Sequence, residues 1–168
     1  ISGMSLKEIS LVIESDWNAL FRRRQYSNDN SDNRIMQEDI DRKPWGNGKG
    51  YYITGKLSHH IYRDDCIFDG SDPDMPVKGL RKYLSAASQL FDRRHSLAHL
   101  TCPLILSTLN EQRTIIAKWR LQGILNLPWH PTIKPMTGST TYYIDENGLI
   151  ERHLELWDIS ALDAFLSV

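Results

Sequence analysis

The chain has 168 residues, a length that suits one domain with a substantial core. Hydrophobic residues make up 40% and charged residues 24%, as in ordinary soluble globular proteins, and the formal net charge is −1. Because twenty basic residues balance twenty-one acidic ones, no overall electrostatic field favours nucleic acid or an anionic membrane as a partner. No apolar run is long enough to cross a bilayer, so no transmembrane segment is predicted.

Helical periodicity marks the first half of the chain. Residues 5–22 place apolar side chains at helical spacing, and Ser5 followed by Glu8 has the form of a capping box. The same spacing predicts a second helix over 52–63 and a third over 77–93. We therefore expect three helices in the N-terminal half.

Residues 25–50 interrupt this pattern. The stretch is polar, has Pro44 and three glycines near its end, and is typical of a long loop or a partly ordered insertion. Its second half nevertheless contains Trp45, between a proline and the glycines. We expect Trp45 to act as an anchor that packs over a cavity mouth or onto a partner protein.

From about residue 97 to residue 158 the pattern is that of at least four antiparallel strands. The stretch 112–125 alternates, which places Trp119 on an apolar face and Lys118 on a polar one. Asn147-Gly148 is a strong hairpin signal. Helices followed by strands predict an α+β domain in which the helices cover one face of a curved antiparallel sheet.

A cluster of five aspartates precedes the third predicted helix. A calcium loop that starts at Asp65 would need oxygen ligands where Ile67 and Pro76 stand, so the spacing fails. Short polar side chains around Pro73 instead suit a turn, because they bond nearby backbone amides. We predict no metal site in this cluster, which comprises Asp64, Asp65, Asp69, Asp72 and Asp74.

The segment ERHLELWD near the C-terminus is the strongest candidate for chemistry. On a strand, His153 and Glu155 share one face with Trp157, and an imidazole beside a carboxylate can abstract and return a proton. The alternative is that the opposite face, with Ile150, Leu154 and Leu156, forms the core while His153 faces solvent or a partner. Alternation by itself favours this alternative, because the opposite face is the more apolar.

Aromatic residues elsewhere are candidates for contacts, although each is more often a core residue. The segment LPWHP holds Trp129 and His130 between two prolines, which predicts a rigid exposed loop or an irregular strand edge that meets a partner. The candidates for lining a ligand pocket are Trp17, Phe21, His60, Phe68, Trp119 and Trp157.

The sequence resembles the nuclear transport factor 2-like superfamily. Residues 61–84 look like its aspartate-containing turn, its short strand and its third helix. The segments LPWHP, G-x-T-x-Y and H-x-E-x-W-D resemble more specifically an uncharacterised SnoaL-like branch found in plants, algae and cyanobacteria. The resemblance covers about residues 5–160, apart from the insertion at 25–50.

The resemblance implies one SnoaL-like domain over residues 1–168 with a conical fold. In that fold a strongly bent antiparallel sheet wraps around three helices and leaves a cavity at its open end. The superfamily often places a polar residue of its short strand at the cavity mouth, which adds Asp69 to His153 and Glu155 as a candidate catalytic residue. Its members include ketosteroid isomerase, polyketide cyclases, scytalone dehydratase and limonene epoxide hydrolase, and also non-catalytic binding or dimerisation modules.

Two functions follow as expectations. The first is a non-catalytic ligand-binding or assembly module, in a plastid or otherwise in the cytoplasm, that binds a small apolar ligand or a protein partner. The second is a small-molecule isomerase, cyclase or dehydratase that uses acid/base residues in the cavity. Neither function needs a cofactor, and both are compatible with a dimer or with a subunit of a larger complex. Fold alone does not decide between them.

Overall fold

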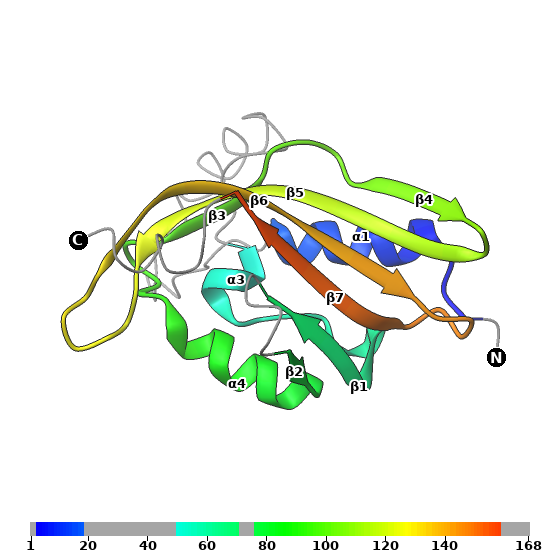
Figure 1. The fold of residues 1–168 in the computed structure, drawn as a ribbon, viewed down its shortest axis with the longest axis horizontal. Coiled ribbons are helices and arrows are strands. Elements are labelled where there is room, and N and C mark those ends of the chain that lie inside the picture. Colours follow the sequence, from blue (N-terminus) through cyan, green and yellow to red (C-terminus); the bar gives the residue numbers. More distant parts are fainter. Residues whose placement is uncertain (1–2, 19–49, 71–75, 159–168) are drawn as a thin grey trace, which may run out of the picture.

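The computed structural model describes residues 3–18, 50–70 and 76–158 (Figure 1). Three α-helices lie in these ranges, followed by the long strands, so the predicted α+β class is confirmed. None of these helices has the length and apolar character needed to cross a membrane. The elements are α1 (Leu6–Trp17), α3 (Gly50–Thr54), the 3-10 helix η1 (His59–Ile61), β1 (Tyr62–Asp69), β2 (Val77–Lys78), α4 (Leu80–Leu90), β3 (Leu97–Leu100), β4 (Ile105–Leu109), β5 (Gln112–Ile124), β6 (Thr132–Ile144) and β7 (Ile150–Trp157).

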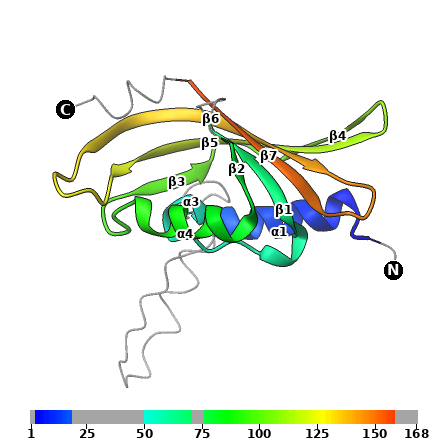
Figure 2. The same ribbon diagram turned by 60° about the horizontal axis from the view of Figure 1, so that its bottom comes forward.

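The described strands form one seven-stranded sheet in the order β2-β1-β7-β6-β5-β3, with β4 also paired to β5. Strands β3 to β7 pair antiparallel, as the sequence predicts for this region. Strand β1, in contrast, runs parallel to β7, so the sheet is mixed. The long strands β5 and β6 arch over the helices, which lie on the concave side of the sheet (Figures 1 and 2).

The alternation of β5 builds the inner face of the sheet. Trp119 is fully buried, whereas Lys118 and Arg120 on either side of it are exposed. The indole Nε1 of Trp119 donates a hydrogen bond of 2.9 Å to Thr140 Oγ1 on β6, so the polar atom of this buried side chain is satisfied. The predicted alternation of this strand is confirmed.

Helix α1 begins where the sequence predicts. The Ser5 side chain accepts from the Glu8 backbone N–H, and the Glu8 carboxylate accepts from the Ser5 N–H at 2.7 Å, which completes the capping box. Near the other end, the Asp16 carboxylate accepts bonds from the backbone N–H and the hydroxyl of Ser58. These bonds fasten α1 to the segment before η1; residues 19–22 of the predicted helix lie outside the described residues.

The predicted helix over 52–63 is wrong beyond Thr54. Gly55 adopts a φ of 65° and its N–H bonds to Tyr51 O, which ends α3 after one turn. A Cβ at Gly55 would lie 2.4 Å from the Ser88 Cα on α4, so the close packing of α4 here requires a glycine. The chain is extended from Tyr62 onward, and Asp64 and Asp65 therefore lie in β1.

The third helix also starts later than predicted. Residues Val77 and Lys78 pair with Phe68 and Ile67 as the short strand β2, and α4 begins at Leu80. Because their backbone N–H and C=O groups bond to β1, these residues belong to the sheet and do not extend the helix.

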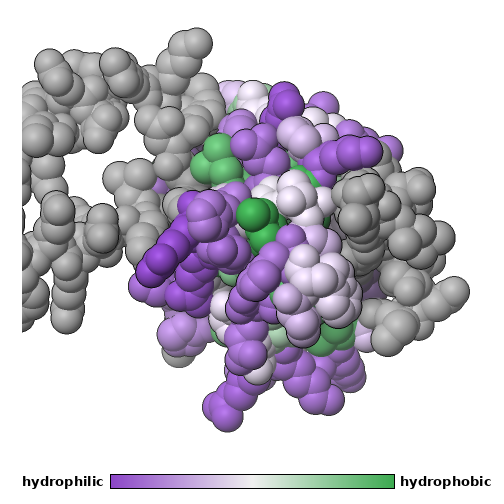
Figure 3. Space-filling model, turned by 90° about the vertical axis from the view of Figure 1, so that its left-hand side faces the viewer, coloured by the Kyte–Doolittle hydropathy of each residue, from purple (hydrophilic) through white to green (hydrophobic). Residues whose placement is uncertain are grey.

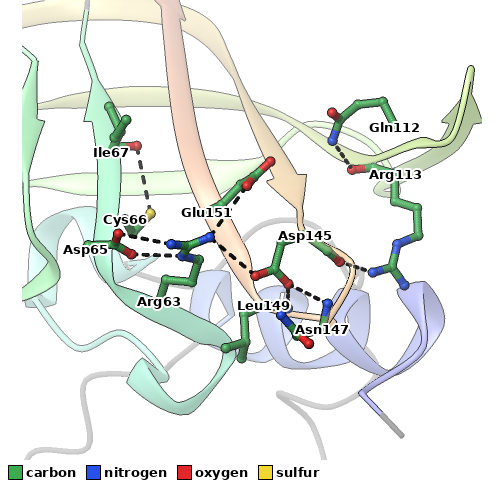
Figure 4. A network of polar contacts seen from close by, with 10 residues as sticks. All are labelled: Arg63, Asp65, Cys66, Ile67, Gln112, Arg113, Asp145, Asn147, Leu149 and Glu151. Atoms are coloured by element: carbon green, nitrogen blue, oxygen red, sulfur yellow. Dashed lines mark hydrogen bonds and ion pairs between the residues drawn. The ribbon is translucent and has the colours of Figure 1, made fainter.

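A polar network holds β1 against the β6–β7 hairpin (Figure 4). The Arg63 guanidinium bonds Asp65 at 2.8 Å and lies 3.7 Å and 3.9 Å from carboxylate oxygens of Asp145 and Glu151. Exposed ion pairs are individually weak, so this network only adds to the backbone pairing of β1 with β7. That pairing sets Phe68 beside His153.

Gly138 offers a test of this packing. A Cβ there would lie 2.5 Å from Trp119 Cη2 and 2.6 Å from the carbonyl oxygen of Leu156. We expect Gly138→Ala to lower the free energy of unfolding by about 1–3 kcal/mol, since the buried indole or the strand must shift. Urea denaturation measures the change, with Ser139→Ala as the control. Equal stabilities of the two variants would contradict the packing described.

Candidate functional site

Strand β7 turns His153 and Glu155 toward the interior. Their side chains are buried, with exposed fractions of 0% and 6%, whereas Leu156 is 57% exposed. The interpretation in which Ile150, Leu154 and Leu156 together form the core face is therefore wrong, and of the three only Ile150 is buried. The polar pair, not the apolar face, packs under the sheet.

The physical reason is an irregularity near the start of β7. Tyr143 of β6 pairs with Arg152, but the next residue, Ile144, pairs with Ile150. Glu151 is thus an extra residue, as in a β-bulge, and it shifts the alternation by one position. Both Ile150 and His153 then face inward, although strict alternation would place them on opposite faces.

The two residues form a direct imidazole–carboxylate pair. His153 Nε2 lies 3.1 Å from Glu155 Oε1. The Tyr83 hydroxyl on α4 donates to the same carboxylate oxygen at 3.2 Å, and the Tyr51 hydroxyl on α3 lies 3.3 Å from His153 Nε2. Each member of the pair is therefore held from a helix on the concave side.

The hydrogen-bonded chain continues to α1. The Tyr51 and Tyr142 hydroxyls lie 3.2 Å apart, and Tyr142 accepts a bond of 3.0 Å from Trp17 Nε1. Aromatic rings enclose the imidazole, with ring centroids 5.0–6.5 Å from that of His153. These rings belong to Tyr51, Tyr62, Phe68, Tyr83 and Tyr142.

Several polar atoms around the pair have unfilled hydrogen-bonding capacity. Among the described residues, five buried side-chain nitrogen or oxygen atoms make no hydrogen bond. One of them, in His99, lies on β3, and another, Tyr52 Oη, has Glu155 and Thr140 as polar neighbours without a well-formed hydrogen bond. The other three are His153 Nδ1, Tyr62 Oη and Trp157 Nε1. Each buried polar atom without a partner lowers the stability of the folded state by about 1–3 kcal/mol. Because several such atoms lie close to the His153–Glu155 pair, we identify this part of the interior as a candidate binding site.

Burial keeps the tyrosines of the site protonated. It raises the pKa of Tyr51, Tyr52, Tyr62 and Tyr83 well above the ordinary value of 10.0. The nearby Glu155 carboxylate raises the pKa of Tyr52 and Tyr83 further. At neutral pH these hydroxyls are hydrogen-bond donors.

The aromatic candidates from the sequence fall into three groups. Trp17, Phe68 and Trp119 are buried in the interior cluster, and Trp157 is half-buried against it. His60 is exposed, because it lies on η1 and that turn directs it outward, so it does not line the interior with Trp17. The remaining candidate, at position 21, lies outside the described residues.

Asp69 does not join the pair. Its carboxylate bonds the Arg152 guanidinium, whose side chain points to the opposite face of β7 from His153. Among the described residues, no three histidine, cysteine, aspartate or glutamate side chains gather where they could hold a metal ion. Asp72 and Asp74 lie outside those residues.

Sequence reasoning missed the tyrosines that hold the site. Tyr51, Tyr52, Tyr62, Tyr83 and Tyr142 come from four separate elements and share no motif. The adjacent pair at 51–52 and the tyrosine at helical spacing in α4 were visible signals, but only the fold directs all of them toward one imidazole.

Two surface hollows lie away from the pair. One of about 550 Å³ is bounded by α4 and the start of the β5–β6 connection, at an end of the molecule that is mostly hydrophilic with small hydrophobic areas (Figure 3). The other, of about 300 Å³, adjoins the Arg63 network. Neither is lined by His153 or Glu155. The first is lined by Lys82, Ser85, Ala86, Gln89, Leu90, Asn126 and Leu127.

The LPWHP segment forms part of the β5–β6 connection. Trp129 is 68% exposed, and His130 adopts a φ of 45°. An exposed tryptophan fits the predicted role in partner binding, which stays a prediction. The other predicted anchor, Trp45, lies outside the described residues.

Removal of one member of the pair should be costly. We expect His153→Leu to lower the free energy of unfolding by about 3–5 kcal/mol, because it leaves the buried Glu155 carboxylate without its partner. The double variant His153→Leu/Glu155→Leu should recover much of that loss. Urea denaturation of the single and double variants measures the coupling. The control is His95→Leu, because His95 is exposed and is also paired with a carboxylate, that of Asp92. If the losses of unfolding free energy from His153→Leu and Glu155→Leu add up in the double variant, a direct interaction is contradicted.

The buried tyrosines predict a loss of stability at alkaline pH. Above pH 10.0 the unfolded chain releases phenolic protons that the folded chain keeps, so rising pH favours unfolding. Urea denaturation between pH 8 and pH 11 should show this decline. Tyr62→Phe removes a phenol that makes no hydrogen bond and should flatten the pH dependence. An unchanged dependence would contradict the burial of the Tyr62 phenol.

Solved structures with a similar fold share little sequence with this chain. An NTF2-like superfamily protein from Salmonella enterica is 14% identical, with a TM-score of 0.49 over 76% of this chain and 92% of that one. A protein of the SnoaL-like family from Agrobacterium tumefaciens is 14% identical, with a TM-score of 0.46 over 91% of this chain and 97% of that one. An NTF2-like protein from Anabaena variabilis is 12% identical, with a TM-score of 0.47 over 66% and 80%.

No curated protein matches the chain in sequence. The profile of the family described as "Uncharacterized conserved protein (DUF2358)" matches residues 51–153. The matched span begins at Tyr51 and ends at His153, two residues that meet in the site. Because the match covers more than half of the chain, the protein belongs to the DUF2358 family.

Proposed function

We propose that the protein binds a small, largely apolar molecule on the inner face of its sheet, with the His153–Glu155 pair as its polar contact. The observation that carries this proposal is the set of unfilled polar atoms in His153, Tyr62 and Trp157. A ligand that supplies partners to several of these atoms would recover part of their burial cost. This gain, added to apolar contact with the surrounding rings, gives a physical basis for affinity.

The chemistry of the interior suggests the class of ligand. The Tyr52 and Tyr62 hydroxyls and the Trp157 N–H are donors, so a carbonyl or hydroxyl oxygen on the ligand suits them. The flat rings of Trp17, Phe68 and Trp119 favour a flat, uncharged body. A cyclic ketone or phenol of about two rings has both features.

Entry of a ligand requires α4 to shift. The Tyr83 hydroxyl covers Glu155, and Tyr83 stacks on Phe68 with ring centroids 3.9 Å apart. Leu80 is the one residue of α4 that is fully buried, and no side chain caps the N-terminus of this helix at Gly79. Apart from the contacts of Tyr83 and the close approach of Ser88 to Gly55, few side chains hold this helix, so it is the element that we expect to shift.

Proton-transfer catalysis is the second candidate function. The 3.1 Å contact between imidazole and carboxylate favours it, because such a pair can remove a proton from carbon and return it elsewhere. An isomerase, cyclase or dehydratase of this kind uses only side chains of the chain itself. It would act on the same ligand class as the binding function.

Location and assembly also belong to this proposal. A plastid setting and membership of a dimer or larger complex are proposals that rest on the sequence resemblance, and a partner contact through Trp129 and His130 is a proposal that rests on the LPWHP segment. The 68% exposure of Trp129 supports the contact. Microscopy of the full-length protein fused to a fluorescent protein tests the location.

A probe ketone can test binding and catalysis together. In 2-tetralone a flat two-ring body carries one carbonyl oxygen, next to exchangeable C–H groups. We expect 2-tetralone to shift the His153 ring signals in NMR spectra, because the ring lies at the centre of the site. His95→Gln, at an exposed histidine, should leave binding unchanged, whereas His153→Phe should abolish it.

The same sample in deuterium oxide distinguishes the two functions. A catalyst would accelerate loss of the exchangeable C–H signals by a factor on the order of 10² or more, and Glu155→Gln would remove the acceleration. If 2-tetralone binds but its C–H exchange is not accelerated, only the binding function is supported. An unchanged His153 signal at millimolar 2-tetralone would count against a ligand of this class.

A further inference from the structure

Strand β4 is an exposed apolar edge of the sheet. Its aliphatic side chains are largely in solvent, with exposed fractions of 45% for Ile105, 42% for Leu106 and 69% for Leu109. β4 pairs with β5 and with no other strand in the described part of the chain. In Figure 1 it forms the rim of the sheet. An unprotected edge of this kind presents backbone groups that can pair with another strand.

The hairpin geometry shows which backbone groups point outward. Asn110 and Glu111 form a two-residue loop with φ values of 48° and 68°, and Leu109 pairs with Gln112 beside it. In such a hairpin, Leu109 and alternate residues before it bond to β5. Leu106 and Thr108 therefore direct their N–H and C=O groups away from β5.

This arrangement is complementary to itself. When two β4 strands lie antiparallel with Ser107 of each on a two-fold axis, Leu106 of one copy faces Thr108 of the other. That position lets each such pair exchange two backbone hydrogen bonds, four in all. On the opposite face, Ile105 of one copy packs beside Leu109 of the other.

The charge pattern also favours a second copy. No charged residue occurs between positions 101 and 110, so two edges meet without like-charge repulsion. Glu111 would face Pro103 of the other copy in this register, not another carboxylate. Edge strands are commonly protected by lysine or proline, and β4 contains neither.

We propose that two copies of the chain associate through their β4 edges and continue one sheet across both molecules. The occupant of the edge is thus a second copy, held by four backbone hydrogen bonds and the exposed aliphatic side chains. The contact is small, so association depends on protein concentration. This proposal is independent of ligand binding, because β4 does not contribute to the His153 site.

Sedimentation of the chain tests the proposal. We expect the mass to rise with concentration from 19.4 kDa toward twice that value. Leu106→Lys sets a charge against the paired strand and should return the mass to that of the monomer. Leu156→Lys gives a matched control, because it makes the same change at a 57% exposed leucine on β7 and should leave the dimer intact.

A disulfide cross-link tests the proposed register of the two β4 strands independently of Leu106→Lys. In a Cys102→Ser background, Ser107→Cys should form a disulfide-linked dimer on mild oxidation, because the two residues meet on the axis. The control Ser85→Cys, at an exposed position on α4, should form no disulfide-linked dimer. A monomer at every concentration, a dimer unchanged by Leu106→Lys, or equal cross-linking of the two cysteine variants would each overturn the proposal.

Discussion

One extra residue in β7 decides what the interior of this protein contains. Glu151 is unpaired with β6, and the shift that it introduces turns His153 and Glu155 inward and Leu156 outward. Without the shift, an apolar face would pack on the helices and the ionisable pair would be in solvent. The buried pair, the tyrosines that bond it and the unfilled polar atoms around it all depend on this irregularity.

The parallel pairing of β1 with β7 completes the surroundings of the pair. The pairing places Phe68 beside His153, and Arg63 adds contacts with carboxylates of β1 and of the β6–β7 hairpin. The bulge and the ion-pair network share Glu151. The residue that turns β7 thus also helps to fasten the neighbouring strand.

A polar interior of this kind carries a stability cost that an all-aliphatic core would avoid. The protein offsets part of the cost with bonds from Tyr51, Tyr83 and Trp17, which reach the pair or its neighbours from three helices. Unfilled polar atoms nevertheless remain beside the pair. These are the atoms to which the proposed ligand would bond.

The sequence by itself determined the features that depend on neighbours along the chain. The Ser5–Glu8 cap, the alternation around Trp119 and the turn at Asn147-Gly148 are local, and each was predicted from spacing and residue type. These features suffice for the α+β class and for the antiparallel order of the long strands. They also identified His153 and Glu155 as candidates, because an imidazole and a carboxylate two residues apart share a strand face.

Only the tertiary structure decided which way that face points. The bulge at Glu151 arises from pairing with β6, the end of α3 from the close approach of Gly55 to α4, and the extension of β1 from its pairing with β7. The tyrosines around the pair come from separate elements and meet only after the chain has folded. Contacts between distant segments leave no periodic trace in the sequence, because each residue satisfies a partner that is far away along the chain.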